Sequence, residues 1–220
     1  MIAENLAELK NNIPEHVKLV AVSKTKSVHQ VYEALGYGQR HFGENKVQEL
    51  VGKYETLSEE IFWHFIGHLQ RNKVKYIAPF VHLIHGVDSF KLLHEINKQG
   101  HKNNRVIPVL LQFHIAQEDT KFGLNLEEAM ALITSDDFEN FNYVCIAGVM
   151  GMASYTADKE QIRKEFKHLK QIFDTLKESH FADNTAFCEI SMGMSGDYSI
   201  AIEEGSTMIR IGSSIFGARE

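Results

Sequence analysis

The chain has 220 residues, of which 44% are hydrophobic, and its net charge at pH 7 is -6. This length and apolar content predict one α/β domain over residues 1–220, because no linker rich in Pro, Gly or Ser interrupts the chain. Lys and Arg are dispersed beside Glu and Asp without forming a basic stripe, which argues against nucleic acid as a partner.

The N-terminus and the two cysteines predict a cytoplasmic protein. Residues 1–10 have the spacing of a short amphipathic helix with acidic residues early, unlike the basic start and apolar middle of a signal peptide. No apolar run approaches the roughly 20 residues that a membrane span needs, so we expect no membrane partner. Cys145 and Cys188 each lie in an apolar, strand-like run, where we expect buried free thiols in a reducing compartment.

Strand-like apolar runs alternate along the chain with segments of helical spacing. The eight runs cover residues 17–23, 41–43, 62–67, 81–87, 106–113, 144–150, 186–190 and 208–211. Helical segments are predicted over residues 28–35, 90–99, 158–179 and 197–205. Ser27, Ser89 and Asp197 stand at the start of three of these segments, as is typical of helix caps.

Repeated strand and helix units within one domain favour a single closed (β/α)8 TIM barrel with an N-terminal helix. In such a barrel, short turns join the elements and active-site groups lie at the C-terminal ends of the strands. An open, doubly wound parallel sheet is the alternative architecture.

Lys24 follows the first apolar run. Because strand side chains alternate between faces, we expect Val20, Val22 and Lys24 on one side, which places an amine after two core-facing valines in a largely dry site. A desolvated lysine loses basicity and can form a Schiff base with an aldehyde. The alternative is that Lys24 only marks the point where a strand meets solvent.

Two segments rich in Gly and Ser follow the seventh and eighth runs. Residues 191–196 are Ser-Met-Gly-Met-Ser-Gly, and residues 210–214 are Arg-Ile-Gly-Ser-Ser. Small residues let backbone N–H groups approach an anion, and TIM barrels frequently bind phosphate with the loops after their last two strands. Either segment alone is equally typical of an ordinary turn.

Arg210 has the same strand parity as Gly212, so we expect its side chain to point into the mouth of the barrel. A guanidinium stays protonated and only donates hydrogen bonds. Facing a pyridine nitrogen, it would keep that nitrogen unprotonated. A Schiff-base lysine on the first strand, a phosphate site on the last two strands and an arginine between them predict a pyridoxal 5'-phosphate site.

Five ordered motifs resemble those of the pyridoxal phosphate homeostasis protein family, whose members are single-domain relatives of the alanine racemase barrel and share the fold of fold-type III pyridoxal phosphate proteins. The motifs are residues 21–26 (Ala-Val-Ser-Lys-Thr-Lys), 42–49 (Phe-Gly-Glu-Asn-Lys-Val-Gln-Glu), 63–73 (Trp-His-Phe-Ile-Gly-His-Leu-Gln-Arg-Asn-Lys), 191–195 (Ser-Met-Gly-Met-Ser) and 205–212 (Gly-Ser-Thr-Met-Ile-Arg-Ile-Gly). One departure is residues 112–115, Gln-Phe-His-Ile, where the family usually carries a smaller apolar residue and Asn. No family role therefore transfers to His114.

The resemblance assigns roles to individual positions. It implies that Lys24 is the Schiff-base lysine and that Arg210 faces the pyridine nitrogen. By the same resemblance, the phosphate lies among Ser195, Gly212 and Ser213. Further positions that match family residues near the cofactor are Asn45, His64 and Met150.

The twelve histidines raise the question of a metal site. The sequence contains neither a His-Glu-x-x-His nor a Cys-x-x-Cys pattern, and His82 and His85, three apart on a predicted strand, should lie on opposite faces. We therefore expect no metal site, and we expect Trp63 to pack in the core.

These observations predict a pyridoxal 5'-phosphate-binding protein that stores, buffers or delivers the cofactor, with apo pyridoxal phosphate enzymes as partners and effects on amino- and keto-acid balance. A racemase needs acid/base groups on both faces of the substrate α-carbon, and relatives in the alanine racemase group supply one from a second domain, for which this chain has no residues left. Arg210 would also weaken the pyridine as an electron sink. We expect no catalytic residues; the alternatives are a low-rate racemase or lyase, and a barrel that serves only protein contacts.

Overall fold

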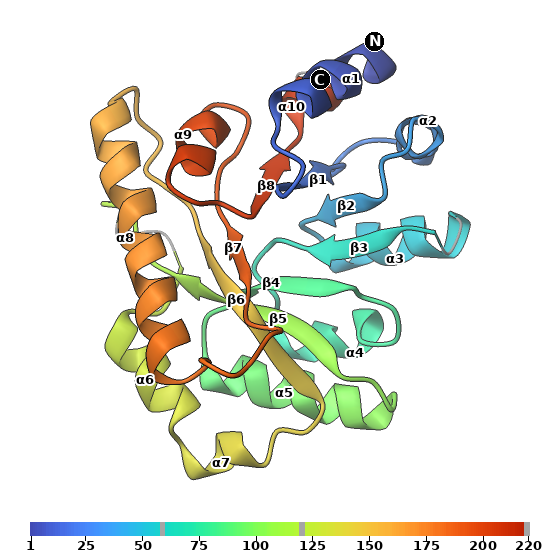
Figure 1. Cartoon of the computed structure of the whole chain (residues 1–220). Helices are drawn as coiled ribbons and strands as arrows, with labels where there is room; N and C mark the ends of the chain where they lie inside the picture. The colour runs from blue at the N-terminus through green and yellow to red at the C-terminus, as the bar shows by residue number, and fades with distance from the viewer. Residues whose placement is uncertain (58–59, 119–121, 218–220) are drawn as a thin grey trace.

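A closed barrel of eight parallel strands organises the computed structural model, which describes residues 1–57, 60–118 and 122–217 (Figure 1). The strands are β1 (Lys18–Val22), β2 (His41–Glu44), β3 (Phe62–Phe65), β4 (Leu83–Val87), β5 (Ile107–Phe113), β6 (Val144–Gly151), β7 (Glu189–Ser191) and β8 (Met208–Ile211). β1 pairs in parallel with both β2 and β8, which closes the sheet. The predicted TIM barrel is confirmed, and the open, doubly wound alternative is wrong.

Helices cover the outside of the barrel (Figure 1). They are α1 (Ile2–Asn12), α2 (Val28–Gly36), α3 (Val47–Thr56), α4 (Val74–Ile77), α5 (Phe90–Lys102), α6 (Leu126–Ile133), α7 (Asp136–Glu139), α8 (Lys159–Ser179), α9 (Tyr198–Glu203) and α10 (Ser213–Phe216), with a 3-10 helix, η1 (Arg71–Lys73). Ser27 caps α2 as predicted, whereas Ser89 and Asp197 stand at helix starts without a side-chain cap bond. The Asn5 side chain donates to the Ile215 carbonyl over 3.0 Å, so α1 and α10 lie side by side.

Two apolar clusters fill the structure on either side of the strands. A small cluster, with one residue from each of five strands, contains Val20, Leu83, Leu110, Met150 and Met208. The large cluster packs the outer faces of the strands against the helices and includes Trp63, which is 1% exposed, as predicted. Since strand side chains alternate, the small cluster marks the inward-facing positions of the barrel.

The two cysteines differ from their prediction. Both are free thiols, but Cys145 is only half-buried and Cys188 is exposed. Cys188 precedes β7, which begins at Glu189, so the strand pattern that predicted its burial does not extend to it. Within the described ranges, no helix is both long enough and apolar enough to cross a membrane.

Gly148 in β6 has a left-handed backbone conformation, with φ of +151°. It lies opposite Glu189 on β7, and a Cβ atom at position 148 would overlap the Glu189 carbonyl oxygen. Gly148→Ala should therefore lower the free energy of unfolding by roughly 2 kcal/mol or more. The measurement is urea unfolding followed by circular dichroism.

Gly52 is the matched control, because it lies inside α3 and a Cβ atom there would meet nothing within 4 Å. Gly52→Ala should leave stability unchanged or raise it by up to about 1 kcal/mol. Equal stability of the two variants would contradict the described path of β6.

Candidate functional site

A cavity of about 560 Å³ opens at the C-terminal ends of the strands. Its wall contains six of the eight residues predicted to hold the cofactor: Lys24, Asn45, Ser195, Arg210, Gly212 and Ser213. The other two lie elsewhere. Met150 is fully buried in the small apolar cluster, and His64 is fully buried between two other histidines.

Lys24 lies in a turn two residues beyond β1, and hydrogen bonds hold the residue on either side of it. The Ser23 amide donates to the Gly43 carbonyl over 3.1 Å, and the Ser23 hydroxyl donates to Glu44 Oε1 over 2.6 Å. The Thr25 amide donates to Glu49 Oε1 over 2.5 Å, with Thr25 itself at φ +66°. Lys24 is half-buried on the cavity wall, so its surroundings are less dry than the sequence predicts.

A buried ion pair between Lys53 and Glu44 contacts this turn. Lys53 of α3 is 5% exposed, and its Nζ donates to Glu44 Oε1 over 2.7 Å, to Glu49 Oε1 over 2.9 Å and to the Ser23 carbonyl over 2.7 Å. Burial raises the pKa of the Glu44 carboxyl, and Lys53 opposes that shift. Separating the two partners would leave each charge buried and uncompensated. The ion pair therefore holds the segment that carries Lys24 in place.

Arg210 brings a cation into the interior of the barrel. Its side chain is 4% exposed, and its guanidinium donates to Ser191 Oγ over 2.7 Å and to the Gly151 carbonyl over 3.1 Å. Burial lowers the pKa of Arg210 to about 10, so the group remains positively charged at neutral pH. A guanidinium has five N–H donors, which leaves it able to donate into the cavity that it lines.

A line of neutral side chains continues inward from Arg210. Ser191 Oγ lies 3.0 Å from His85 Nδ1, His85 Nε2 lies 2.9 Å from His64 Nδ1, and His64 Nε2 lies 2.9 Å from His41 Nδ1. Burial lowers the pKa of all three histidines, that of His41 to about 4. Each neutral imidazole has one donor and one acceptor, so the line can be satisfied throughout its length.

The segments rich in Gly and Ser form another part of the cavity wall. At Gly212, a Cβ atom would lie 3.1 Å from the Val22 carbonyl oxygen, so the position favours a residue without a side chain. Ser213 begins α10, and Ser195 lies in the loop between β7 and α9. Short side chains and backbone N–H groups at such positions suit an anionic group.

Asn45 presents an unused acceptor at the same cavity. Its Oδ1 atom is buried and makes no hydrogen bond to the described part of the chain. Buried polar atoms are nearly always paired, so this oxygen is suited to a hydrogen-bond donor from a bound molecule.

Sequence reasoning missed the residues that support the wall. Ser191 belongs to a quoted motif, but nothing in the motif indicates that it accepts from Arg210. Glu49 and Lys53 are four apart on a helix, a spacing typical of an exposed ion pair, and the packing of α3 against β2 buries Lys53.

Comparison with known proteins agrees with this architecture. The family model described as alanine racemase, N-terminal domain, matches residues 1–220. The chain is 40% identical over 205 residues to the pyridoxal phosphate homeostasis protein of Aquifex aeolicus, covering 92% of this chain and 87% of that protein. The human protein of the same name is 39% identical, covering 92% of this chain and 77% of its own length.

Solved structures have the same fold. PipY of Synechococcus elongatus, solved without pyridoxal phosphate, superposes with a TM-score of 0.91 at 32% identity and covers 99% of this chain and 100% of its own. The same protein with pyridoxal phosphate bound has a TM-score of 0.89. An alanine racemase of Clostridium difficile, at 17% identity and a TM-score of 0.79, shares the fold and is covered over 60% of its length.

The buried ion pair of Lys53 makes a stability prediction. Lys53→Met leaves the Glu44 carboxylate buried without its cation, and the free energy of unfolding should fall by about 3–5 kcal/mol. Chemical denaturation measures this loss. Lys170→Met is the control, because Lys170 pairs with Asp174 on the surface of α8, where such a pair contributes roughly 0–1 kcal/mol. A loss at position 53 no larger than at position 170 would show that the pair does not stabilise the turn.

Proposed function

The chain belongs to the pyridoxal phosphate homeostasis protein family, and from this premise we propose that it binds pyridoxal 5'-phosphate through Lys24 and takes part in the homeostasis of that cofactor. The observation that carries the proposal is that Lys24, Arg210 and Gly212 line one cavity of about 560 Å³. When bound, the cofactor supplies an aldehyde that reacts reversibly with amines and a pyridine ring that can accept electrons.

The side chains on the cavity wall fit the three functional parts of this cofactor. Lys24 supplies an amine for the aldehyde, and Arg210 supplies a cationic donor for the ring nitrogen. Ser195, Gly212 and Ser213 supply hydroxyl and backbone donors for the phosphate. The unpaired Oδ1 of Asn45 is available to a donor on the ring or on an incoming amine. A pocket of this volume is also of the size that small cofactors occupy.

The chemistry of Arg210 favours holding the cofactor over turning substrates over. Arg210 keeps its proton at neutral pH and can only donate a hydrogen bond to the pyridine nitrogen. A nitrogen that accepts this hydrogen bond stays unprotonated. An unprotonated ring is a weak electron sink. The protein is therefore a store, buffer or carrier of the cofactor rather than an efficient amino-acid racemase or lyase.

A carrier requires recipients, and apo pyridoxal phosphate enzymes are the proposed partners. Attachment through Lys24 is reversible by water or by exchange with another amine, and the half-exposed position of Lys24 gives such molecules access. We place this exchange in the cytoplasm. The free thiols of Cys145 and Cys188 are compatible with a reducing compartment.

Lys24→Ala tests the attachment directly. The wild type, reduced with borohydride, should yield one peptide that carries the cofactor on residue 24, and Lys24→Ala should yield none while keeping its circular dichroism spectrum. Lys26→Ala is the matched control, since Lys26 lines the same cavity two residues away. Cofactor fixed to Lys26 in the wild type would refute the assignment.

The phosphate contacts make a prediction about affinity. Hydrogen bonds to a charged group contribute roughly 1.5–3 kcal/mol each, so Ser213→Ala, which removes one hydroxyl donor, should weaken cofactor binding by about tenfold to a hundredfold. Gly212→Val should weaken binding further, because its side chain would press on the Val22 carbonyl. Fluorescence titration with pyridoxal 5'-phosphate measures both.

Gly196→Ala is the control for this series. Gly196 lines the same cavity, yet a Cβ atom there would meet nothing within 4 Å, so affinity should hardly change. Wild-type protein should also bind pyridoxal far more weakly than its 5'-phosphate. Equal affinity for the two compounds would rule out a phosphate site.

A further inference from the structure

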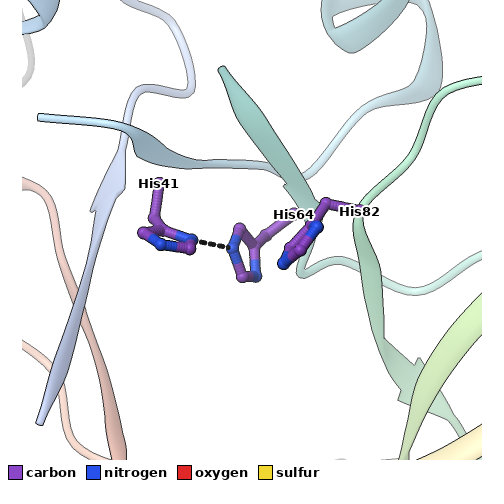
Figure 2. Close-up of side chains that lie close together, drawn as sticks. All are labelled: His41, His64 and His82. Carbon is purple, nitrogen blue, oxygen red and sulfur yellow. Dashed lines mark hydrogen bonds between the residues drawn. The ribbon is translucent and has the colours of Figure 1, made fainter. Parts of the chain in front are cut away.

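Three histidine side chains lie close together in the barrel (Figure 2). Two of them stand at the N-terminal ends of their strands, whereas the cavity opens at the C-terminal ends. His41 is the first residue of β2, His64 lies in β3, and His82 directly precedes β4. One ligand nitrogen of each lies within 4.8 Å of the others. His41 Nδ1 and His64 Nε2 are 2.9 Å apart, and the His82 ring centroid lies 5.3 Å from that of His64.

The sequence could not show this cluster. The absence of zinc-binding sequence patterns, and a strand alternation that places His82 and His85 on opposite faces, led us to expect no metal site. In the structure, β4 begins only at Leu83, so His82 lies before the strand and its amide donates to the Trp63 carbonyl of β3 over 2.8 Å. Both histidines contact the His64 ring, with ring centroids 5.3 Å (His82) and 5.1 Å (His85) from its own.

We propose that His41, His64 and His82 bind a divalent transition metal ion of the Zn²⁺ class. Two nitrogens bonded to tetrahedral Zn²⁺ at about 2.0–2.1 Å from the metal lie roughly 3.3 Å from each other. The His41 and His64 nitrogens need to separate by only a few tenths of an ångström from their 2.9 Å contact to reach this spacing. The His82 nitrogen lies within 4.8 Å of the other two and would have to approach them by up to about 1.5 Å to complete this spacing.

Access and ligand chemistry suit such an ion. His41 and His82 are half-buried, so an ion can arrive from solvent, whereas His64 is fully buried and forms the floor of the site. Burial lowers the pKa of all three imidazoles, which keeps them neutral and able to coordinate at pH 7. Three imidazole donors favour Zn²⁺, Cu²⁺ or Ni²⁺ over Mg²⁺ and Ca²⁺, which prefer oxygen. Three protein ligands leave a fourth position for water.

Two cations and one carboxylate act on the His82 ring, so its surroundings carry a net positive charge. The charge of Lys18 lowers the pKa of all three imidazoles. Lys18 itself forms an ion pair with Glu189 over 2.6 Å. Arg105 also acts on His82, and its guanidinium is occupied by the Ala78 and Val81 carbonyls. The Glu189 carboxylate acts on His82 with the opposite sign and offsets part of the repulsion that a metal ion would meet.

The surroundings also orient the buried ligand. With a metal on Nε2 of His64, the proton of that ring lies on Nδ1 and is donated to His85 Nε2. His85 in turn donates from Nδ1 to Ser191 Oγ, whose second lone pair accepts from Arg210. Metal-bound histidines almost always donate their other N–H in this way.

The test is calorimetric titration of the full-length chain with Zn²⁺ alone, together with the visible spectrum after Co²⁺ is added. The wild type should bind one ion and give the absorption of Co²⁺ in a nitrogen-donor site. His41→Gln and His82→Gln should each weaken binding at least tenfold. Glutamine at position 41 keeps an amide that can donate to His64, so this variant separates metal binding from folding. His29→Ala, on the exposed face of α2, should bind as the wild type does.

Lys24→Ala should bind the ion as tightly as the wild type does. This result separates the histidine site from any metal that the cofactor itself chelates. It also makes the outcome of the metal test independent of the proposed function. The proposal is overturned if the wild type binds Zn²⁺ no more tightly than the His41→Gln/His82→Gln double variant. Loss of binding in His29→Ala or Lys24→Ala to the same degree would overturn it as well.

Discussion

The guanidinium of Arg210, buried inside the barrel, is the constraint on which the rest of the polar interior depends. A buried cation is tolerated only when it is hydrogen-bonded, and Ser191 of β7 and the Gly151 carbonyl of β6 supply the acceptors. Ser191 must then be satisfied in turn, and His85 and His64 extend the hydrogen bonding inward. A barrel core that would otherwise be filled by aliphatic layers thus contains a polar axis, with a cavity at one end and a cluster of histidines at the other.

The cavity is built between two rigid supports on opposite sides. On the β8 side, Arg210 is fixed by neighbouring strands. On the β1 side, the turn that carries Lys24 is fixed by a buried ion pair between Lys53 and Glu44. Because the wall is supported on both sides, the protein needs little reorganisation when a ligand binds, which favours affinity.

Strand alternation was the most reliable guide from sequence to structure. It correctly grouped Val22 with Lys24 and Arg210 with Gly212 on the cavity side, because each pair lies at or just beyond the end of a regular strand. It does not account for the contact between the His82 and His64 rings, because His82 precedes its strand. The apolar run that predicted a buried Cys188 also fails, because β7 begins only at Glu189. The burial of Lys53 could not be predicted at all, since it depends on how α3 packs. Resemblance located six residues of the wall, whereas His64 and Met150 are fully buried elsewhere in the barrel.

The central claim, that the chain holds its cofactor without turning substrates over, is tested most directly by α-proton exchange. The cofactor-loaded chain is incubated with L- and D-amino acids in deuterated water, and then mixed with an apo aminotransferase. We predict negligible multiple-turnover exchange together with recovery of aminotransferase activity as the cofactor is transferred. Exchange at ordinary enzymatic rates, on the order of 1 per second or faster, would contradict the claim and identify a racemase-like enzyme.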